Sequence, residues 1–195
     1  MRLKVGSGLN LAAMPWHLLD RLQEGVSLVQ RTMDRQQSIG RPFQIRVAEP
    51  KDAEAISECL VLAFAQFRGQ YTPGAYADTV LNSEGVLQRL AQMGMFVAVS
   101  DGSVIGTIAY KANGVEGHLR GMAVLQEWRG TGVASALLNA AEVELRESRC
   151  AVITLDTTEP LIRAIEFYKR HSFIASGRVT DFFGMPLYEY TKGLH

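Results

Sequence analysis

The sequence predicts a mixed α/β domain whose central sheet is mostly antiparallel and is flanked by helices. From Phe43 onward, β-rich runs alternate with stretches in which apolar residues recur every three or four positions. This is the pattern of strands and helices in one layered domain. A short apolar run at 151–155 follows a helix, where a crossover returns the chain as a parallel strand. We therefore expect one parallel strand pair among antiparallel neighbours.

Composition limits the class of protein. The chain has 195 residues, which suits one domain of ordinary size, and its 20 basic residues equal its 20 acidic ones. Nucleic-acid-binding modules usually carry a basic excess, and no apolar run here approaches the roughly 18 residues that cross a bilayer. The two cysteines and four histidines lack metal-ligand spacing. We expect a cytoplasmic protein with no metal and with no nucleic-acid or membrane partner.

Residues 1–42 are expected to form a helical extension, and residues 43–195 the main domain. Apolar residues of the extension recur at three- and four-residue steps: Trp16, Leu19, Leu22, Val26, Val29 and Met33. This periodicity indicates an amphipathic helix, which a break at 39–42 ends. We expect the helix to pack on the main domain or on a second copy of the chain. A membrane-surface or partner-binding helix is the alternative.

The main domain begins with a strand and two helices. Residues 43–47 alternate apolar and polar side chains, as a strand does, and an apolar helix face runs over 53–67. A turn-rich loop at 68–74 follows. A second, weaker helix is expected at 76–92, interrupted near Gly85.

Three strands should then form an antiparallel meander. The β-rich runs at 95–99 and 104–110 are joined through Asp101 and Gly102, and Asp-Gly between such runs is a strong hairpin signal. A third run follows at 117–125, and apolar spacing predicts a helix over 133–145.

The parallel strand is followed by a helix and a last hairpin. Thr157 or Thr158 is expected to cap the helix, with Pro160 in its first turn. The runs 173–177 and 187–191 make the hairpin. The resulting order is strand, two helices, three strands, helix, strand, helix and two strands.

A glycine-rich turn joins the third strand of the meander directly to the next helix. Gly130 and Gly132 remove side chains where a ligand would approach the backbone, and the first-turn amides of a helix form an anion site together with its dipole. Arg129 adds a positive charge beside them. The turn lacks the lysine of a Walker A loop and the third glycine of a dinucleotide fingerprint. It predicts a phosphate or pyrophosphate cradle, unless the glycines serve turn geometry alone.

Two motifs resemble those of one enzyme family. The spacing Arg129-x-x-Gly132-x-Ala134 resembles the acetyl-CoA signature of the GNAT superfamily of N-acetyltransferases, and residues 164–173 resemble a second segment of that family. The resemblance covers about residues 43–194 and implies the GNAT fold, in which the parallel strand pair splays apart. Leu161 stands where the family often has asparagine, and Ser172 where it has glycine.

The resemblance implies a cofactor site for acetyl-CoA. The backbone amides that would hold the CoA pyrophosphate belong to Arg129, Gly130, Thr131, Gly132, Val133, Ala134 and Ser135. Met122, Ala123 and Val124 would hydrogen-bond the pantetheine as an added strand. The amide of Val124 or Met122 would polarise the thioester carbonyl while an amine attacks it directly. Tyr168 matches the tyrosine that protonates the departing CoA thiolate, although a core position is its alternative.

The attacking amine must lose a proton, and two side chains are candidates for accepting it. Glu116 and His118 lie two residues apart on one strand and therefore face the same side. Arg120 shares that face and could instead hold Glu116 in an ion pair. The alternative for these residues is a solvated strand face without a catalytic role.

The acceptor pocket is expected between two loops rich in aromatic residues. The loop between the first two helices supplies Phe67, Tyr71 and Tyr76, and the last hairpin supplies Asp181, Phe182 and Phe183. Such a wall with one carboxylate suits a small cationic amine, or it closes the sheet edges or a homodimer interface. The acceptor would be a small amine or a protein amino group. A non-catalytic acyl-CoA sensor and transfer of a longer acyl group are the alternatives.

Overall fold

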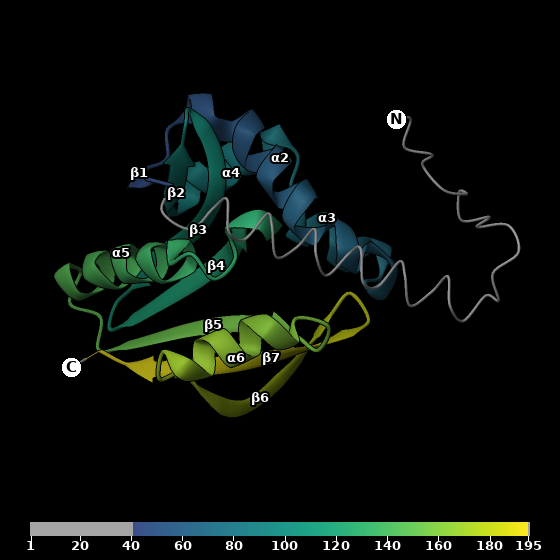
Figure 1. Ribbon diagram of the computed structural model, residues 1–195. Coiled ribbons are helices and arrows are strands. Elements are labelled where there is room, and N and C mark those ends of the chain that lie inside the picture. Colours follow the sequence, from purple (N-terminus) through teal and green to yellow (C-terminus); the bar gives the residue numbers. More distant parts are fainter. Residues whose placement is uncertain (1–40, 195) are drawn as a thin grey trace, which may run out of the picture.

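The computed structural model describes residues 41–194 (Figure 1). The helical extension expected over residues 1–42 therefore lies outside the described residues, apart from Arg41 and Pro42, which belong to no helix or strand. The remaining chain builds one seven-stranded sheet in the order β1-β2-β3-β4-β5-β7-β6. All neighbouring strands are antiparallel except β4 and β5, which are parallel, so the expected fold class is confirmed.

The strands and helices follow the predicted alternation. The strands are β1 Gln44–Val47, β2 Gly94–Ser100, β3 Ser103–Asn113, β4 Glu116–Val124, β5 Val152–Thr158, β6 Ile174–Phe182 and β7 Met185–Gly193. The α-helices are α2 Ala53–Phe64, α3 Pro73–Thr79, α4 Ser83–Gln92, α5 Val133–Glu147 and α6 Ile162–Arg170. Short 3₁₀ turns are η2 Pro50–Asp52, η3 Ala65–Gln70 and η4 Gln126–Trp128. In Figure 1, α2 and α4 lie on the opposite side of the sheet from α5.

The helix expected over 76–92 is in fact two helices. Thr72 caps α3 by accepting a hydrogen bond from the amide of Ala75, and Asn82 caps α4 by accepting one from the amide of Gly85 at 2.9 Å. The break therefore falls just before Asn82, and Gly85 lies inside the first turn of α4. The expected loop at 68–74 is taken up by η3 and the start of α3. Side-chain capping, rather than glycine, sets these boundaries.

The expected cap at Thr157 or Thr158 is also wrong. Both residues continue β5, where they pair with Tyr188 and Leu187 of β7. Ladder pairing with β7 satisfies this stretch of backbone, so α6 begins only at Ile162 without a side-chain cap. The final hairpin is also longer than expected, because β6 and β7 stay paired as far as Phe182 and Met185.

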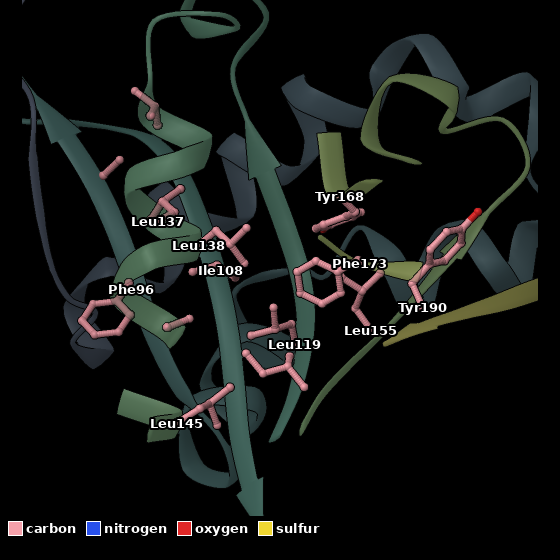
Figure 2. Packing of buried hydrophobic residues seen from close by; sticks show 14 of the residues in the cluster. Phe96, Ile108, Leu119, Leu137, Leu138, Leu145, Leu155, Tyr168, Phe173 and Tyr190 are labelled. Atoms are coloured by element: carbon pink, nitrogen blue, oxygen red, sulfur yellow. The ribbon is translucent and has the colours of Figure 1, made fainter. Parts of the chain in front are cut away.

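Two apolar clusters lie on opposite faces of the sheet. The cluster under α5 and α6 includes Leu137 and Leu138 of α5, Leu119 of β4 and Tyr168 and Phe173 near the end of α6 (Figure 2). The second cluster lies under α2, and its fully buried members include Ile56, Leu60, Val86 and Val97. The strands from β1 to β4 are thus covered on both faces, whereas nearly every residue of β6 is exposed.

The parallel pair is short, and a bulge marks where it ends. β4 and β5 are in register only from Glu116 and Val152 to Leu119 and Leu155. In β4, Gly121 and Met122 together stand opposite one residue of β3. Gly121 has a φ of +61°, a conformation that favours glycine, and bulges bend the strand that carries them. A gap between β4 and β5 follows from this geometry, as expected for a splayed pair.

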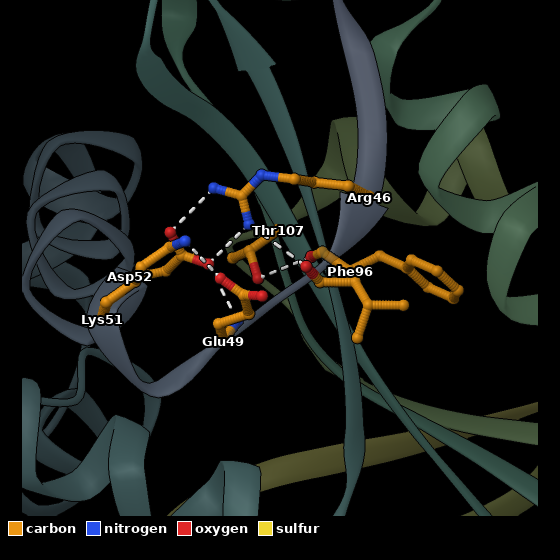
Figure 3. Close-up of polar contacts among 7 residues, drawn as sticks. Arg46, Glu49, Lys51, Asp52, Phe96 and Thr107 are labelled. Carbon is orange, nitrogen blue, oxygen red and sulfur yellow. Dashed lines mark hydrogen bonds and ion pairs between the residues drawn. The ribbon is translucent and has the colours of Figure 1, made fainter.

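An ion pair fixes the start of α2 to β1 (Figure 3). The guanidinium of Arg46 donates to both carboxylate oxygens of Asp52, at 2.6 and 2.8 Å, and the amide of Glu49 donates to the same carboxylate at 2.8 Å. The hydrogen bond from Arg46 lowers the pKa of Asp52 to about 2. This buried carboxylate therefore stays charged and paired at neutral pH.

Candidate active site

The turn between β4 and α5 has the geometry of an anion cradle. Gly132 is the N-cap of α5 with a φ of +96°, and a Cβ at this position would meet no atom within 4 Å. The first intrahelical hydrogen bond runs from the amide of Ala136 to the carbonyl of Gly132 at 3.0 Å. The amides of Val133, Ala134 and Ser135 therefore have no intrahelical acceptor, and the helix dipole favours an anion at this end of α5.

The first part of the turn is organised differently from the sequence-based expectation. The amide of Arg129 donates to the carbonyl of Gln126 at 3.2 Å, and that of Thr131 donates to the carbonyl of Trp128 at 3.4 Å. The Arg129 guanidinium turns toward α2 and donates to the carbonyl of Ala63 at 3.0 Å. Burial lowers its pKa. Arg129 thus braces the turn against α2, and the expected contribution of its positive charge to the cradle stays a prediction.

The residues after the bulge have no strand partner on the side of β5, although the carbonyl of Val124 accepts a hydrogen bond from Nε of Arg129 at 3.4 Å. The amide of Leu125 donates to the carbonyl of Ile105 in β3 at 3.0 Å. Because backbone groups alternate in direction along a strand, the N–H groups of Val124 and Met122 point away from β3. The pairing with β5 has ended by then, so these groups face the gap between the splayed strands. Ala123, between them, packs in the cluster under α2.

Tyr168 of α6 lies beside this gap. Its hydroxyl donates to the sulfur of Met122 at 3.4 Å, and its ring packs edge-on against Phe167 and Phe173. Burial raises the pKa of Tyr168, so the phenol keeps its proton at neutral pH. The ring lies in the core, as one interpretation expects. The hydroxyl reaches the strand that lines the gap, and its role as a proton donor stays a prediction.

An unforeseen link joins α6 to the cradle. The Nδ1 atom of His171 lies 2.9 Å from the carbonyl oxygen of Phe167. A carbonyl can only accept, so Nδ1 is the donor there. The other ring nitrogen, Nε2, lies 3.1 Å from the hydroxyl of Ser135, in the first turn of α5. The sequence shows His171 next to the second motif, but only the packing of α6 reveals this contact.

A polar cavity opens on the sheet face opposite α5. Its volume is about 180 Å³. The lining side chains come from four adjacent strands: Glu116, His118, Thr154, Asp156, Arg178, Thr180, Leu187 and Glu189. Three of them are carboxylates, so the cavity is suited to cationic groups. The cavity contains both predicted base candidates and adds Asp156, which the sequence analysis missed.

A hydrogen-bond chain sets the protonation of His118. The hydroxyl of Thr154 donates to Glu116 at 3.0 Å and lies 2.9 Å from Nδ1 of His118. Because the hydroxyl hydrogen goes to the carboxylate, Nδ1 must donate to Thr154. The other nitrogen, Nε2, lies 3.8 Å from the carboxylate of Asp156. Burial lowers the pKa of His118 against the opposing effect of Asp156, so His118 is neutral at pH 7 and its Nε2 can accept a proton.

Two further charged residues lie near the cavity. Arg120 pairs with Asp78 of α3, so the alternative in which it holds Glu116 in an ion pair is wrong. Burial raises the pKa of Asp156. Asp156 lies one residue past the predicted end of its strand. Continuing the alternation through Thr154 and Asp156 would have placed Asp156 on the same strand face as Thr154, whereas its place beside His118 comes from the register between β4 and β5.

The two aromatic loops do meet at the far end of β5. The hydroxyl of Thr72 donates to the carbonyl of Phe183 at 2.8 Å, and Tyr71 and Thr158 share a hydrogen bond between their hydroxyls. The carboxylate of Asp181 accepts from the amide of Gly184 at 3.2 Å. Asp181 therefore stabilises the hairpin turn rather than supplying the pocket carboxylate that the sequence suggested. The cavity carboxylates on β4, β5 and β7 take that place.

The cysteines belong to the core rather than to the site. Both Cys59 and Cys150 are free and buried, and burial raises the pKa of Cys59 to about 12. Within residues 41–194, no group of three His, Cys, Asp or Glu side chains has an arrangement that could hold a metal ion. No helix in the same range has the length and apolar character needed to span a membrane.

The chain is similar to known acetyltransferases. The acetyltransferase (GNAT) family matches residues 56–173. An aminoglycoside N(6')-acetyltransferase type 1 of Stenotrophomonas maltophilia is 30% identical over 155 residues, which cover 73% of this chain and 93% of the relative. The N-alpha-acetyltransferase MAK3 of Arabidopsis thaliana is 29% identical over 92 residues. That match covers 45% of this chain and 48%, about half, of the plant protein.

Solved structures share the fold. A GNAT acetyltransferase from Staphylococcus aureus Mu50 superimposes with a TM-score of 0.66 at 18% identity, over 79% of this chain and 100% of its own. The PaiA N-acetyltransferase of Thermoplasma acidophilum, solved in complex with coenzyme A, gives a TM-score of 0.65 at 18% identity, over 78% and 99% of the two chains. These likenesses establish the architecture.

Proposed function

Because this chain belongs to the GNAT family of acetyltransferases, we propose that it transfers the acetyl group of acetyl-CoA directly to a primary amine. The observation that carries this proposal is the cradle at Val133, Ala134 and Ser135, next to the edge at Met122 and Val124 that has no strand partner on the side of β5. An anion site and an unpaired strand edge together suit a ligand with a pyrophosphate and an extended amide chain.

The cofactor would occupy both features at once. The pyrophosphate would accept hydrogen bonds from the amides of Val133, Ala134 and Ser135. The pantetheine would lie in the gap and pair with the backbone of Met122 and Val124, which places the thioester next to the bulge. Leu161, which directly precedes α6, has an apolar side chain that cannot donate a hydrogen bond to the pantetheine. Backbone groups of β4 therefore provide most of the polar contacts with the pantetheine.

The reaction follows from groups that meet at the gap. A neutral amine attacks the thioester carbon, and the N–H of Val124 or Met122 stabilises the developing oxyanion. The C–N bond forms, the C–S bond breaks, and the sulfur leaves as a thiolate. Tyr168 stays protonated until the thiolate forms, because its pKa is raised, and its hydroxyl already contacts Met122. It would give its proton to the thiolate and regain one from solvent.

His118 is the best placed residue to accept the proton of the amine. It is neutral at pH 7, and its Nε2 lies next to the cavity and to Asp156. Asp156 would stabilise the resulting imidazolium. His118 precedes the bulge by three residues, or about 10 Å along the strand, so the proton would travel through water. Glu116 supports this arrangement through Thr154.

The cavity favours an acceptor with positive charge. Its three carboxylates, Glu116, Asp156 and Glu189, outnumber Arg178. Only Glu189 among them pairs with that arginine, at 3.5 Å. The names of the two relatives refer to the 6'-nitrogen of an aminoglycoside and to an α-nitrogen. Both acceptor types carry ammonium groups, so we retain a small amine or a protein amino group as the acceptor. A cytoplasmic location and a homodimer stay predictions.

The proposal is tested by the release of free CoA. The purified chain is mixed with acetyl-CoA and a panel of amines, and the thiol is titrated over time. We expect amine-dependent thiol release and an acetylated product in the mass spectrum. An acyl-CoA sensor would bind the cofactor without releasing thiol. The same assay with butyryl-CoA and octanoyl-CoA determines the preferred acyl length.

A further inference from the structure

A buried arginine of α4 lies against the bulge in β4. Arg89 is 9% exposed. Among residues 41–194, its side chain makes one hydrogen bond, from Nη2 to the carbonyl of Asp78 at 3.4 Å. A guanidinium has five N–H donors, and burying a charge without a charged partner is costly. Arg89 thus has more donors than the described residues satisfy.

The nearest carboxylate is already engaged. Asp78 pairs with Arg120, which is more exposed than Arg89. Burial, and then the charge of Arg120, lower the pKa of Arg89 to about 10. The guanidinium is still charged at neutral pH. Two arginines and one aspartate therefore leave a net charge of +1 at this point of the sheet.

Among the other charged side chains on this face, Arg178 pairs with Glu189, and Asp156 lies beside the neutral His118. In contrast, Arg89 has no carboxylate of its own in the described part of the chain. An added anion would satisfy the free donors of its guanidinium.

Gly121 lets the guanidinium reach the bulge. A Cβ on this residue would lie 2.5 Å from Nη1 of Arg89, so any larger residue would push the arginine away. Gly121 directly precedes Met122, whose backbone faces the gap. The charge of Arg89 therefore lies one residue from the proposed thioester site, between it and the acidic cavity that starts at His118.

We propose that Arg89, supported by Arg120, binds a carboxylate of the acceptor, so that the preferred acceptors are amino acids acetylated on the amine next to that carboxylate. This inference rests on the proposed function. The carboxylate would lie at the bulge, the adjacent amine would face the thioester, and a second ammonium group on the side chain would extend toward Glu116 and Asp156. Arg89 is then a specificity-determining residue.

Matched acceptor pairs test this proposal. L-lysine and 1,5-diaminopentane differ only by the carboxylate, as do L-ornithine and 1,4-diaminobutane. We expect kcat/KM for the amino acid to exceed that for the diamine by at least about tenfold, with the acetyl group on the α-amine in the mass spectrum. In Arg89→Gln the ratio should fall to about one, and in Arg89→Lys it should be intermediate.

Controls separate this inference from a loss of folding and from the proposed function. Arg146→Gln removes an arginine of α5, on the other face of the sheet, where it pairs with Glu142; it should leave both activity and the ratio unchanged. Equal use of amino acids and diamines by the wild type overturns the inference, as does a ratio that Arg89→Gln leaves unchanged. If the wild type acetylates none of these compounds but releases thiol with another amine of the panel, the inference fails and the proposed function stands.

Discussion

The two halves of the sheet differ in how their faces are covered. The strands from β1 to β4 have an apolar cluster on each face, under α2 and under α5. In the second half, β5, β7 and β6 carry α6 on one face (Figure 1), and their other face lines a polar cavity. The first half thus supplies most of the buried apolar surface. In the second half, polar side chains line the cavity, where they can contact a substrate.

The boundary between the halves is where the candidate site forms. The parallel pairing of β4 and β5 ends at Leu119 and Leu155, and the backbone edge of β4 beyond it is unpaired. The cradle at Gly132 lies in the turn that follows β4, at the start of α5, while His118 precedes the bulge. The candidate site therefore depends on β4, which packs within the first half of the sheet and lines the gap to the second half.

The largest expected effect is on the free energy of unfolding, and it is found by comparing one leucine in each half of the sheet. Leu137 of α5 is fully buried, so Leu137→Ala should lower the free energy of unfolding by about 3 kcal/mol. Leu187 lines the open cavity, and Leu187→Ala should lower the free energy of unfolding by less than about 1 kcal/mol. Urea unfolding measures both values. Equal losses would show that the open face contributes as much to stability as the core.

The next effect concerns the proposed base in the open half. Removing it in His118→Gln should lower kcat about 100-fold, or about 2.7 kcal/mol. Because burial holds the pKa of His118 below its ordinary 6.5, the neutral form is present above that lowered value and is lost as pH falls through it. The wild-type kcat should therefore decline only below pH 6.5.

The pH profile of the variant provides the check. His118→Gln should lack this acidic decline, while Lys169→Gln, an exposed change on α6, should keep it. An identical decline in wild type and His118→Gln would assign the titration to another group and remove His118 from the mechanism.

A third, somewhat smaller effect is the contribution of Asp52, in the first half of the molecule, to the free energy of unfolding. The pKa of Asp52 is lowered from 3.8 to about 2 by its pairing with Arg46. The carboxylate therefore stabilises the fold above pH 4, and this contribution is lost as pH falls toward 2. Asp52→Asn should lower the free energy of unfolding by about 2 kcal/mol at pH 7. A difference from wild type that persists unchanged at pH 2 would argue against the ion pair as its source.

The smallest effect comes from the residue at the boundary. Tyr168→Phe removes the proposed proton donor but keeps the ring that packs against Phe173. A thiolate leaves readily compared with most leaving groups, so we expect kcat to fall only about tenfold, or about 1.4 kcal/mol. The affinity for CoA, measured by calorimetry, should stay near that of the wild type. An unchanged kcat would return Tyr168 to a purely structural role.

Features set by neighbouring residues could be predicted from the sequence. The Asp101-Gly102 turn fixes the hairpin between β2 and β3 locally, and the glycines of the cradle are contiguous with the helix that they precede. The parallel pair could be predicted as well, because the handedness of crossovers restricts where a returning strand can lie.

Contacts between distant segments could not be predicted in the same way. The position of Asp156 beside His118 depends on the register between two strands far apart in the sequence. The pairing of Arg120 with Asp78 and the turn of Arg129 toward Ala63 depend on where α3 and α2 pack. Nothing in the local pattern around these charges specifies their partners, so the sequence indicated the residue types and the structure supplied the contacts.

Calorimetric titration of CoA tests the central claim, that the open amides at the start of α5 hold its pyrophosphate. Gly132→Asp places a carboxylate against the anion, whereas Gly132→Asn has the same size and the same backbone requirement without the charge. We predict that the aspartate variant binds CoA at least about 100-fold more weakly than the asparagine variant. Equal affinities of the two variants would contradict the account.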